Sequence, residues 1–339
     1  MIPYAKHSVT ADDINAVLSV LCSDRLTQGP TVPKLEAALA EKCGAKYAVA
    51  VSSGTAALHL AYLACGVGPG TTVLTSPVSF VATANAVLYC GADVEFRHEG
   101  ALWESDVVVP IDLGGDPCIM ASESTVIRDA CHSLHFNPDT DMAACFSFHP
   151  CKHIAAGEGG AIVTNDFTID EKCRALRDHG RYMTAKGKWQ TATPVGMQMY
   201  DMGFNYRLAE IPAALALSQL KRLDTNIAER RRIAALYDSA FKGVPVQHSP
   251  QSARHLYQIL VDDRDNVRQE LAKRGVGTQV HYEPIIPLQP YYKDRFGYRE
   301  GMWPNAEAFA ARTLSIPLYP TMTEEDITHV IQGVSNVVG

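Results

Sequence analysis

Paired cysteines, long apolar runs and an excess of basic residues are all missing from this sequence of 339 residues. Its nine cysteines, at positions 22, 43, 65, 90, 118, 131, 145, 151 and 173, are dispersed, and no two of them form a CxxC pair. An odd number of scattered thiols argues against a disulfide framework or a zinc site and favours a reducing compartment. We therefore expect no bound metal and a cytoplasmic location.

No apolar run reaches the roughly 20 residues that span a bilayer, and the N-terminus lacks the charged and apolar segments of a secretion signal. Lysine and arginine number 30 against 37 aspartate and glutamate residues, which gives a formal net charge of -7. This balance excludes the broad basic surface of most nucleic-acid-binding proteins. We expect neither nucleic acid nor a membrane as a partner, and an anionic ligand would need a local cationic or dipolar site.

What the sequence does contain is a regular alternation of short apolar strands and helices. Strands are predicted at 47–51, 72–76, 94–96, 107–111, 126–128, 143–146 and 161–164, with helices at 56–65 and 79–89. This alternation is typical of an α/β domain with a mostly parallel sheet, in which ligands bind at the carboxyl ends of the strands.

Two further segments complete the predicted organisation. Near the N-terminus, residues 10–13 resemble the cap of an amphipathic helix whose apolar face carries Ile14, Val17, Leu18 and Leu21. From about residue 249 the composition is that of a smaller α/β unit, with strands predicted at 257–261 and 277–281 and a helix at 266–274. We predict a large domain over residues 1–225 and a small C-terminal domain over residues 226–339.

One lysine stands at the centre of this pattern. Lys152 follows the apolar strand that ends at Phe146 and precedes the glycine-rich residues 157–160. Small neighbours and a tight turn are the setting of a partly buried amine, and burial disfavours a charged ammonium group. A neutral amine is a nucleophile for carbonyl carbons and a base. The alternative is an ordinary surface lysine in a loop.

Polar residues lie at the predicted strand ends. Residues 52–56 join a strand to a helix N-terminus, whose free amides and dipole could bind a phosphate around Gly54, although an ordinary N-cap would look the same. Asp129 ends the strand at 126–128 and could pair with a protonated heterocyclic nitrogen or simply cap a helix. His132 could pack against the same ring or orient Asp129, and Ser147 offers a hydroxyl near Lys152.

Together these residues form the parts of a pyridoxal phosphate site. Lys152 would form the Schiff base, Asp129 would keep the pyridine nitrogen protonated, and the helix at Gly54 would hold the phosphate. Phe80 could stack on the ring, although a core phenylalanine is the default for such a residue taken alone.

Seven motifs give this interpretation a family. They are residues 26–29, 53–58, 129–132, 146–152, 157–160, 203–207 and 315–318. With them the sequence resembles the DegT/DnrJ/EryC1/StrS family of nucleotide-sugar aminotransferases. The resemblance implies the aspartate aminotransferase-like fold of fold-type I pyridoxal phosphate enzymes, with a large mixed, mostly parallel sheet and a small C-terminal α/β domain.

The resemblance also assigns roles to individual residues. It implies that the cofactor is held by Gly54, Thr55, Ala56, Phe80, Asp129, His132, Ser147, Lys152 and Asn205, with Lys152 as the catalytic acid and base. Asn205 would reach the phosphate of a partner subunit, which implies a homodimer with a shared active site. The sugar nucleotide would be bound by His179, Arg207, His281 and Tyr282.

Within the family, residues 79–85, 254–257 and 277–284 are most similar to the transaminases of pseudaminic acid biosynthesis. This likeness implies transfer of an amino group from L-glutamate, which leaves as 2-oxoglutarate, to a UDP-linked 4-keto-6-deoxy sugar, giving UDP-4-amino-4,6-dideoxy-N-acetyl-β-L-altrosamine. Another sugar 3- or 4-aminotransferase of the perosamine, bacillosamine or viosamine type is the alternative. A dehydrating branch of the family has histidine in place of Lys152, and a non-enzymatic scaffold would not need Lys152, Asp129 and Ser147.

The chain departs from the family between residues 97 and 143, where members usually have several dozen more residues. We therefore predict a compact variant with fewer peripheral helices.

Overall fold

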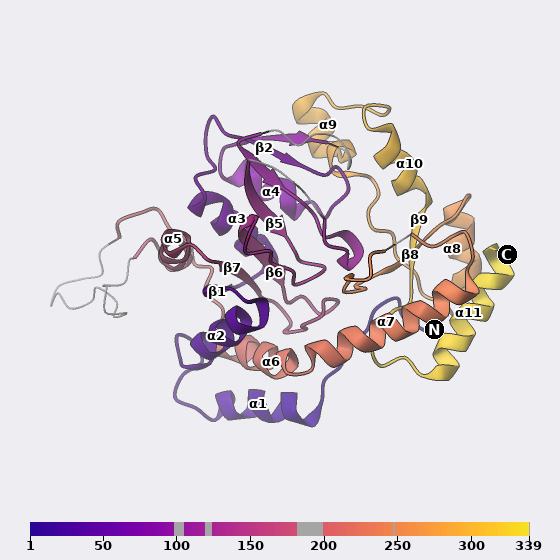
Figure 1. Ribbon diagram of the computed structural model, residues 1–339, viewed down its shortest axis with the longest axis horizontal. Helices are drawn as coiled ribbons and strands as arrows, with labels where there is room; N and C mark the ends of the chain where they lie inside the picture. Colours follow the sequence, from indigo (N-terminus) through magenta and orange to yellow (C-terminus); the bar gives the residue numbers. More distant parts are fainter. Residues whose placement is uncertain (98–104, 119–123, 182–198, 247, 339) are drawn as a thin grey trace.

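The computed structural model describes residues 1–97, 105–118, 124–181, 199–246 and 248–338. A seven-stranded sheet lies at its centre (Figure 1). Its strands are β1 (Tyr47–Val51), β2 (Thr72–Thr75), β3 (Asp93–Phe96), β4 (Val107–Val109), β5 (Thr125–Asp129), β6 (Asp141–Ser147) and β7 (Gly160–Thr164). The order is β1-β7-β6-β5-β4-β2-β3, and only β7 runs antiparallel to its neighbours. The predicted α/β class with a mixed, mostly parallel sheet is confirmed.

Helices cover both faces of this sheet because successive strand residues point to opposite sides. Val49 and Cys145 face a core formed with α3 (Gly54–Ala64), α4 (Ala82–Tyr89) and α5 (Phe167–Arg177). Their neighbours Ala50 and Phe146 face a second core, formed with α2 (Thr31–Cys43) and α6 (Glu210–Leu220). Outside α6 lies α1 (Ala11–Leu21). The result is a three-layer α/β/α arrangement.

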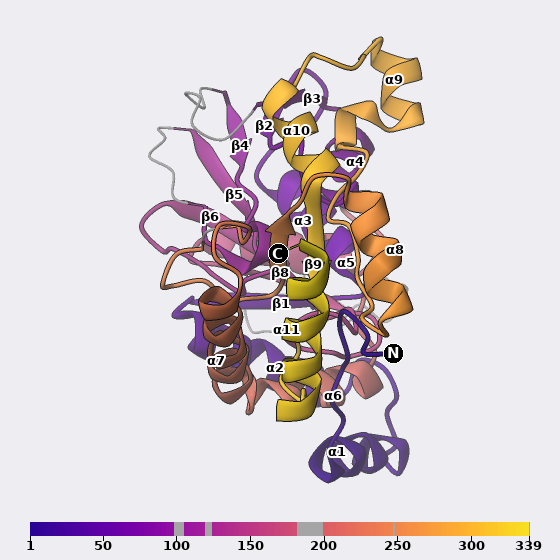
Figure 2. The same cartoon turned by 90° about the vertical axis from the view of Figure 1, so that its right-hand side faces the viewer.

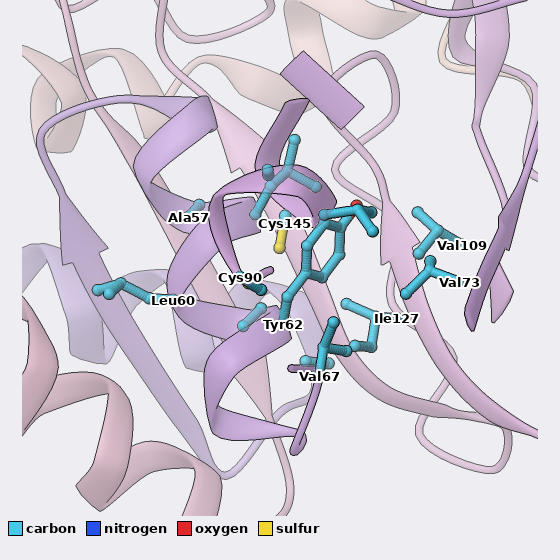
Figure 3. Packing of buried hydrophobic residues seen from close by; sticks show 14 of the residues in the cluster. Ala57, Leu60, Tyr62, Val67, Val73, Cys90, Val109, Ile127 and Cys145 are labelled. Atoms are coloured by element: carbon cyan, nitrogen blue, oxygen red, sulfur yellow. The ribbon is translucent and has the colours of Figure 1, made fainter. Parts of the chain in front are cut away.

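The first core is close-packed around an aromatic side chain of α3. Figure 3 shows Tyr62 between Val67, Ile127 and Cys145, so the ring lies between the helix and the sheet. The hydroxyl of Tyr62 donates to the carbonyl of Thr83, 3.2 Å away. Burial of the phenol raises the pKa of Tyr62 well above its ordinary value. This packing fixes α3 and α4 against the strands whose ends carry the predicted site.

The long helix α7 (Leu223–Ala240) leads to the smaller unit (Figure 2). This unit contains β8 (Tyr257–Leu260) and β9 (Thr313–Ile316), which pair antiparallel, and the helices α8 (Arg264–Lys273) and α11 (Glu324–Val338). They enclose a core of their own. Helices α9 (Pro290–Phe296) and α10 (Pro304–Arg312) lie beside the large sheet, where the indole of Trp303 donates to the carbonyl of Phe96 at 3.0 Å.

The smaller unit differs from the predicted one in its second strand and in the N-terminal residues that bind to it. The strand predicted at 277–281 is wrong: among the described residues its one bridge joins Gln279 to Ser315, and β9 is the strand that pairs with β8. The N-terminal residues that we assigned to the large domain hydrogen-bond with the small unit, since Ile2 pairs with Val276. The predicted boundary at 225 falls within α7, and the division into two domains stays a prediction.

The region predicted to be shortened supplies β4, β5 and the start of β6 to the central sheet. Besides these strands, the described residues 105–118 and 124–143 contain one helix, the three-residue 3-10 helix η1 (Leu113–Gly115), and no α-helix. Among the described helices, none is both long and apolar enough to cross a membrane.

A buried carboxylate ties α2, β1 and α5 together. Glu36 accepts hydrogen bonds from the backbone amide of Ala50 at 2.9 Å, from Arg174 at 2.7 Å and from Arg177 at 2.5 Å. Burial, the largest single effect, favours the protonated form, but the guanidinium groups of Arg177 and Arg174 outweigh it and lower the pKa of Glu36. Because the folded pKa lies below the unfolded one, the contribution of Glu36 to stability is present above the unfolded pKa and is lost as pH falls through the folded value.

Replacing this carboxylate tests the network. Glu36→Gln should lower the free energy of unfolding by about 2–4 kcal/mol near neutral pH, because two partly buried guanidinium groups lose a charged partner. The deficit should shrink as pH falls below about 4.5, the ordinary pKa of a glutamate. Urea unfolding from pH 3.5 to 7 measures both effects. The exposed Glu41→Gln on the same helix is the control, and a deficit independent of pH would contradict the assignment.

Candidate active site

A cavity of about 530 Å³ lies at the carboxyl ends of β5 and β6, beside the N-terminus of α3. It is closed on one side by residues 279–282 of the small unit. Most of the residues predicted to form the site line this one cavity: Gly54, Thr55, Phe80, Asp129, His132, Ser147, Lys152, His281 and Tyr282. They come from distant parts of the sequence, so the fold brings the predicted constellation together.

One end of the cavity is built for an anion. Ser53 caps α3, and its hydroxyl accepts from the amide of Ala56 at 3.0 Å. The amides of Gly54 and Thr55 have no hydrogen-bond acceptor within the part of the chain that the structure describes. A β-carbon on Gly54 would lie 2.9 Å from the β-carbon of Ser147, so only glycine allows this approach. The N-cap and the phosphate site are therefore compatible, with two free amides and a helix dipole facing the cavity.

The carboxylate of Asp129 is held by neutral donors. Its Oδ2 accepts from Thr83 Oγ1 at 2.7 Å, and its Oδ1 accepts from the amide of Cys131 at 3.2 Å. Ser79 Oγ lies 2.9 Å from the hydroxyl of Thr83 and supports it. Asp129 is only 6% exposed, and it faces the cavity. A carboxylate has more than two acceptor positions, so Asp129 can still pair with a protonated ring nitrogen.

Lys152 lies in the turn that follows β6. The turn is fixed by backbone hydrogen bonds from Lys152 to the carbonyl of His149 and from Ala156 to that of Phe148, both 2.8 Å. The side chain is half-buried, as expected. Burial first, and then the charge of Lys152, lower the pKa of His281 to about 4. The amine therefore lies close to a histidine that stays neutral at physiological pH.

A second histidine lies between the cavity and the small unit. The amide of Gly114 donates to Nδ1 of His132 at 3.2 Å, and Nε2 of His132 lies 3.2 Å from the hydroxyl of Tyr282. Burial lowers the pKa of His132 well below its ordinary value, and Lys152 lowers it further. Both ring nitrogens of His132 therefore have partners other than Asp129. This favours the prediction that His132 packs beside a ligand, and it disfavours the alternative that His132 orients Asp129.

Four of the predicted residues, Ala56, His179, Asn205 and Arg207, are not part of the lining of this cavity. Asn205 and His179 are exposed, and Arg207 forms an ion pair with Asp178 beside a separate cavity of about 240 Å³. The amide of Ala56 is used by the cap of Ser53. The roles of these residues stay predictions, and Asn205 is placed where a second chain could reach it.

Sequence reasoning missed two residues that shape the site. Thr83 lies in the 79–85 motif, where only Phe80 was singled out, and nothing local shows that its hydroxyl supports Asp129. Gly114 lies in a Gly-Gly pair that signals a tight turn, and its φ of +67° confirms one. The partner of its amide, His132, could only be found in three dimensions.

Comparison with known proteins gives this geometry a family. A model of the DegT/DnrJ/EryC1/StrS aminotransferase family matches residues 7–98 and 104–335. The spore coat polysaccharide biosynthesis protein SpsC of Bacillus subtilis (strain 168) is 35% identical over 381 aligned positions, covering 99% of this chain and 97% of that protein.

Two further proteins are similar over nearly their whole length. The UDP-4-amino-4,6-dideoxy-N-acetyl-beta-L-altrosamine transaminase of Campylobacter jejuni subsp. jejuni serotype O:23/36 (strain 81-176) is 34% identical, covering 97% of this chain and 96% of that protein. The structure of Spr1654 from Streptococcus pneumoniae in its PMP form matches with a TM-score of 0.89 and 26% identity, covering 99% of both chains.

The support of Asp129 can be tested without any ligand. Thr83→Val keeps the shape of the side chain but leaves one oxygen of a buried carboxylate without its donor. We expect the free energy of unfolding to fall by about 1–3 kcal/mol, measured by urea denaturation at pH 7. Thr83→Ser retains the hydroxyl and should recover most of the loss. A loss in Thr83→Ser, with Thr83→Val as stable as the wild type, would mean that the methyl group, and not the hydrogen bond, matters.

Proposed function

We infer the activity of this chain from its family: the chain belongs to the DegT/DnrJ/EryC1/StrS aminotransferase family. It is a pyridoxal phosphate-dependent sugar aminotransferase with the aspartate aminotransferase-like fold of fold-type I enzymes. The similar protein Spr1654 has been solved in both PLP and PMP forms. When bound, this cofactor supplies an electron-withdrawing ring that lets a neighbouring carbon lose a proton.

The residues of the large cavity fit this cofactor. The amides of Gly54 and Thr55 and the hydroxyl of Ser147 suit its phosphate, and Asp129 suits its ring nitrogen. Phe80 lines the cavity and is 58% exposed, so a flat ligand would cover it. The observation that carries the proposal is that Lys152, Asp129 and the N-terminus of α3 line the same cavity.

Lys152 is proposed as the residue that bonds to the cofactor and moves protons during transfer. Among the described residues that line the cavity, it is the only lysine, and arginine is absent. Burial lowers the pKa of the neighbouring His132 and His281, so both are weak proton acceptors at neutral pH. Because Lys152 lines the cavity, the alternative that it is an ordinary surface lysine is disfavoured.

We propose that L-glutamate donates its amino group and leaves as 2-oxoglutarate, and that a UDP-linked 4-keto-6-deoxy sugar accepts it. The product would be UDP-4-amino-4,6-dideoxy-N-acetyl-β-L-altrosamine, the sugar in the name of the 34% identical Campylobacter protein. A second candidate is another keto sugar of a surface polysaccharide, of the perosamine, bacillosamine or viosamine type. This second candidate is supported by the 35% identity to SpsC, a protein named for spore coat polysaccharide biosynthesis.

A substrate panel separates these candidates. The purified protein with pyridoxal phosphate and L-glutamate should convert UDP-2-acetamido-2,6-dideoxy-β-L-arabino-hex-4-ulose at least about tenfold more efficiently than UDP- or dTDP-linked 4-keto sugars of other configuration. Product is measured by mass spectrometry. Lys152→Ala, the negative control, should lower turnover by about 10⁴-fold. Preference for another sugar would select the second candidate, and turnover by Lys152→Ala would refute the role of the lysine.

We also propose a homodimer with a shared site. The sugar nucleotide and glutamate are both anionic, yet the described lining of the cavity contains no guanidinium group. Asn205 is exposed on the loop that leads to α6. The residues before and after it, Phe204 and Tyr206, stack on each other with their ring centroids 5.0 Å apart. A second chain that brings Asn205 to the phosphate would complete the site.

Mixed dimers test the sharing directly. Asn205→Asp should weaken cofactor binding at least about tenfold, because a carboxylate would face the phosphate. If Asn205 acts on the partner, a Lys152→Ala/Asn205→Asp heterodimer, purified through two different tags, contains one site with both residues intact. It should recover about half of the wild-type activity. An activity no higher than half that of the Asn205→Asp homodimer, or a monomer by light scattering, would exclude the shared site.

A further inference from the structure

A chain of three hydrogen-bonding groups leads from the backbone into the cavity. It begins at the amide of Gly114, passes through the ring of His132 and ends at the hydroxyl of Tyr282, with both steps 3.2 Å long. His132 and Tyr282 line the cavity. A backbone amide can only donate a hydrogen bond, so the first step has one possible direction.

That direction sets the proton on the histidine. Since Nδ1 of His132 accepts from Gly114, it carries no proton, and a neutral imidazole must then carry its proton on Nε2. Nε2 therefore donates to the oxygen of Tyr282. The oxygen of Tyr282 then accepts from His132, so its own O–H proton must point away from His132. Because Tyr282 lines the cavity, we infer that this proton points into the cavity.

The start of the chain is rigid. The carbonyls of Gly114 and Gly115 accept from the amides of Leu256 at 3.1 Å and Ala253 at 2.7 Å, which anchor the turn to the small unit. A β-carbon on Gly115 would lie 2.8 Å from the amide nitrogen of His255, so a larger residue would displace the turn. The amide of Gly114 shares a peptide plane with the carbonyl of Leu113, which accepts from the amide of Asp116 at 3.2 Å, so turning this amide away from His132 would break that bond.

The histidine stays neutral because of what surrounds it. Burial lowers its pKa, and the charge of Lys152 and the rings of His281 and His153 lower it further. The ring of His255 lies 4.3 Å from that of His132, and its own pKa is also well below the ordinary value. Burial also raises the pKa of Tyr282, so the phenol keeps its proton.

We propose that Tyr282 is a hydrogen-bond donor of fixed direction to an acceptor oxygen of a bound ligand, and that His132 is the residue that fixes this direction. The assignment rests on the proposed function and deepens it. A carbonyl or phenolate oxygen accepts such a bond, whereas the ammonium group of an amino sugar cannot. Tyr282 therefore favours the keto substrate or the cofactor oxygen over the aminated product.

The proton position can be measured without cofactor or sugar. In the apoprotein labelled with ¹⁵N-histidine, the signal assigned to His132 by its loss in His132→Gln should show a protonated Nε2 and an unprotonated Nδ1 from pH 6 to 8. A proton on Nδ1, or a charged ring at pH 7, would overturn the proposal. This result stands even if the protein acts on a different sugar, so it separates failure of this inference from failure of the proposed function.

Three variants then test the donor. Tyr282→Phe should weaken ligand binding by about 10- to 100-fold. A rise in the dissociation constant of pyridoxal phosphate, followed by absorbance, identifies the cofactor as the acceptor, and a rise in KM for the keto sugar alone identifies the sugar. His132→Glu offers only an acceptor, which turns the phenol proton away from the cavity, so it should match Tyr282→Phe although the tyrosine is present.

His132→Gln is the matched control, because its amide can still donate to Tyr282. It should bind the ligand more tightly than His132→Glu, whereas Tyr291→Phe, at an exposed tyrosine outside the cavity, should stay within about threefold of the wild type. Circular dichroism and thermal unfolding establish that each variant is folded. Equal impairment by glutamine and glutamate, or binding by Tyr282→Phe indistinguishable from the wild type, would show that His132 and Tyr282 only fill space.

Discussion

The close approach of three backbone segments is the constraint on which the active site depends. Strand β7 runs antiparallel between β1 and β6, and it thereby holds the turn after β1 beside the end of β6. A β-carbon on Gly160 would lie 2.5 Å from the carbonyl oxygen of Ser53 and 2.7 Å from that of Phe146. At Gly54 the space is closed by Ser147. The phosphate-sized end of the cavity and the lysine turn can therefore be neighbours only because these positions lack side chains.

A second constraint is how the fold distributes buried charge along β5. Arg128 and Asp129 are consecutive and both buried, but the alternation of the strand sends them to opposite faces. Arg128 pairs with Asp112 at 2.9 Å and with Asp141 at 2.8 Å, which neutralises it within the protein. Asp129 has only neutral donors among its recorded partners. A buried carboxylate without a cation is costly, and a cationic ring nitrogen would relieve that cost.

Much of this could be predicted from sequence, because the features that carried the prediction are local. Strand ends, a glycine-rich turn and a helix start place Asp129, Lys152 and Gly54, since parallel strands share one carboxyl edge. What could not be predicted depends on distant partners. Thr83 and Gly114 act on residues far along the chain, and the segment 277–281 reads as a strand although Thr313–Ile316 takes its place beside β8. Periodicity likewise predicted that α1 has an apolar face, but it could not predict what this face contacts. In the structure, Ile14 and Leu18 of this face are 59% and 53% exposed.

The charges that line the cavity follow from these constraints, and they bear on the proposal of a homodimer. Burial keeps His132, His255 and His281 neutral, so they contribute direction through hydrogen bonds and no charge. The positive potential then comes from Lys152 and the dipole of α3, and the described lining adds two carboxylates, Asp129 and Glu158. A phosphate, a diphosphate and the carboxylates of an amino donor need more cationic groups than this. Phe80 and Asn205 are exposed among the described residues, and in the proposed homodimer one surface of the second copy would supply both the cover and the charge.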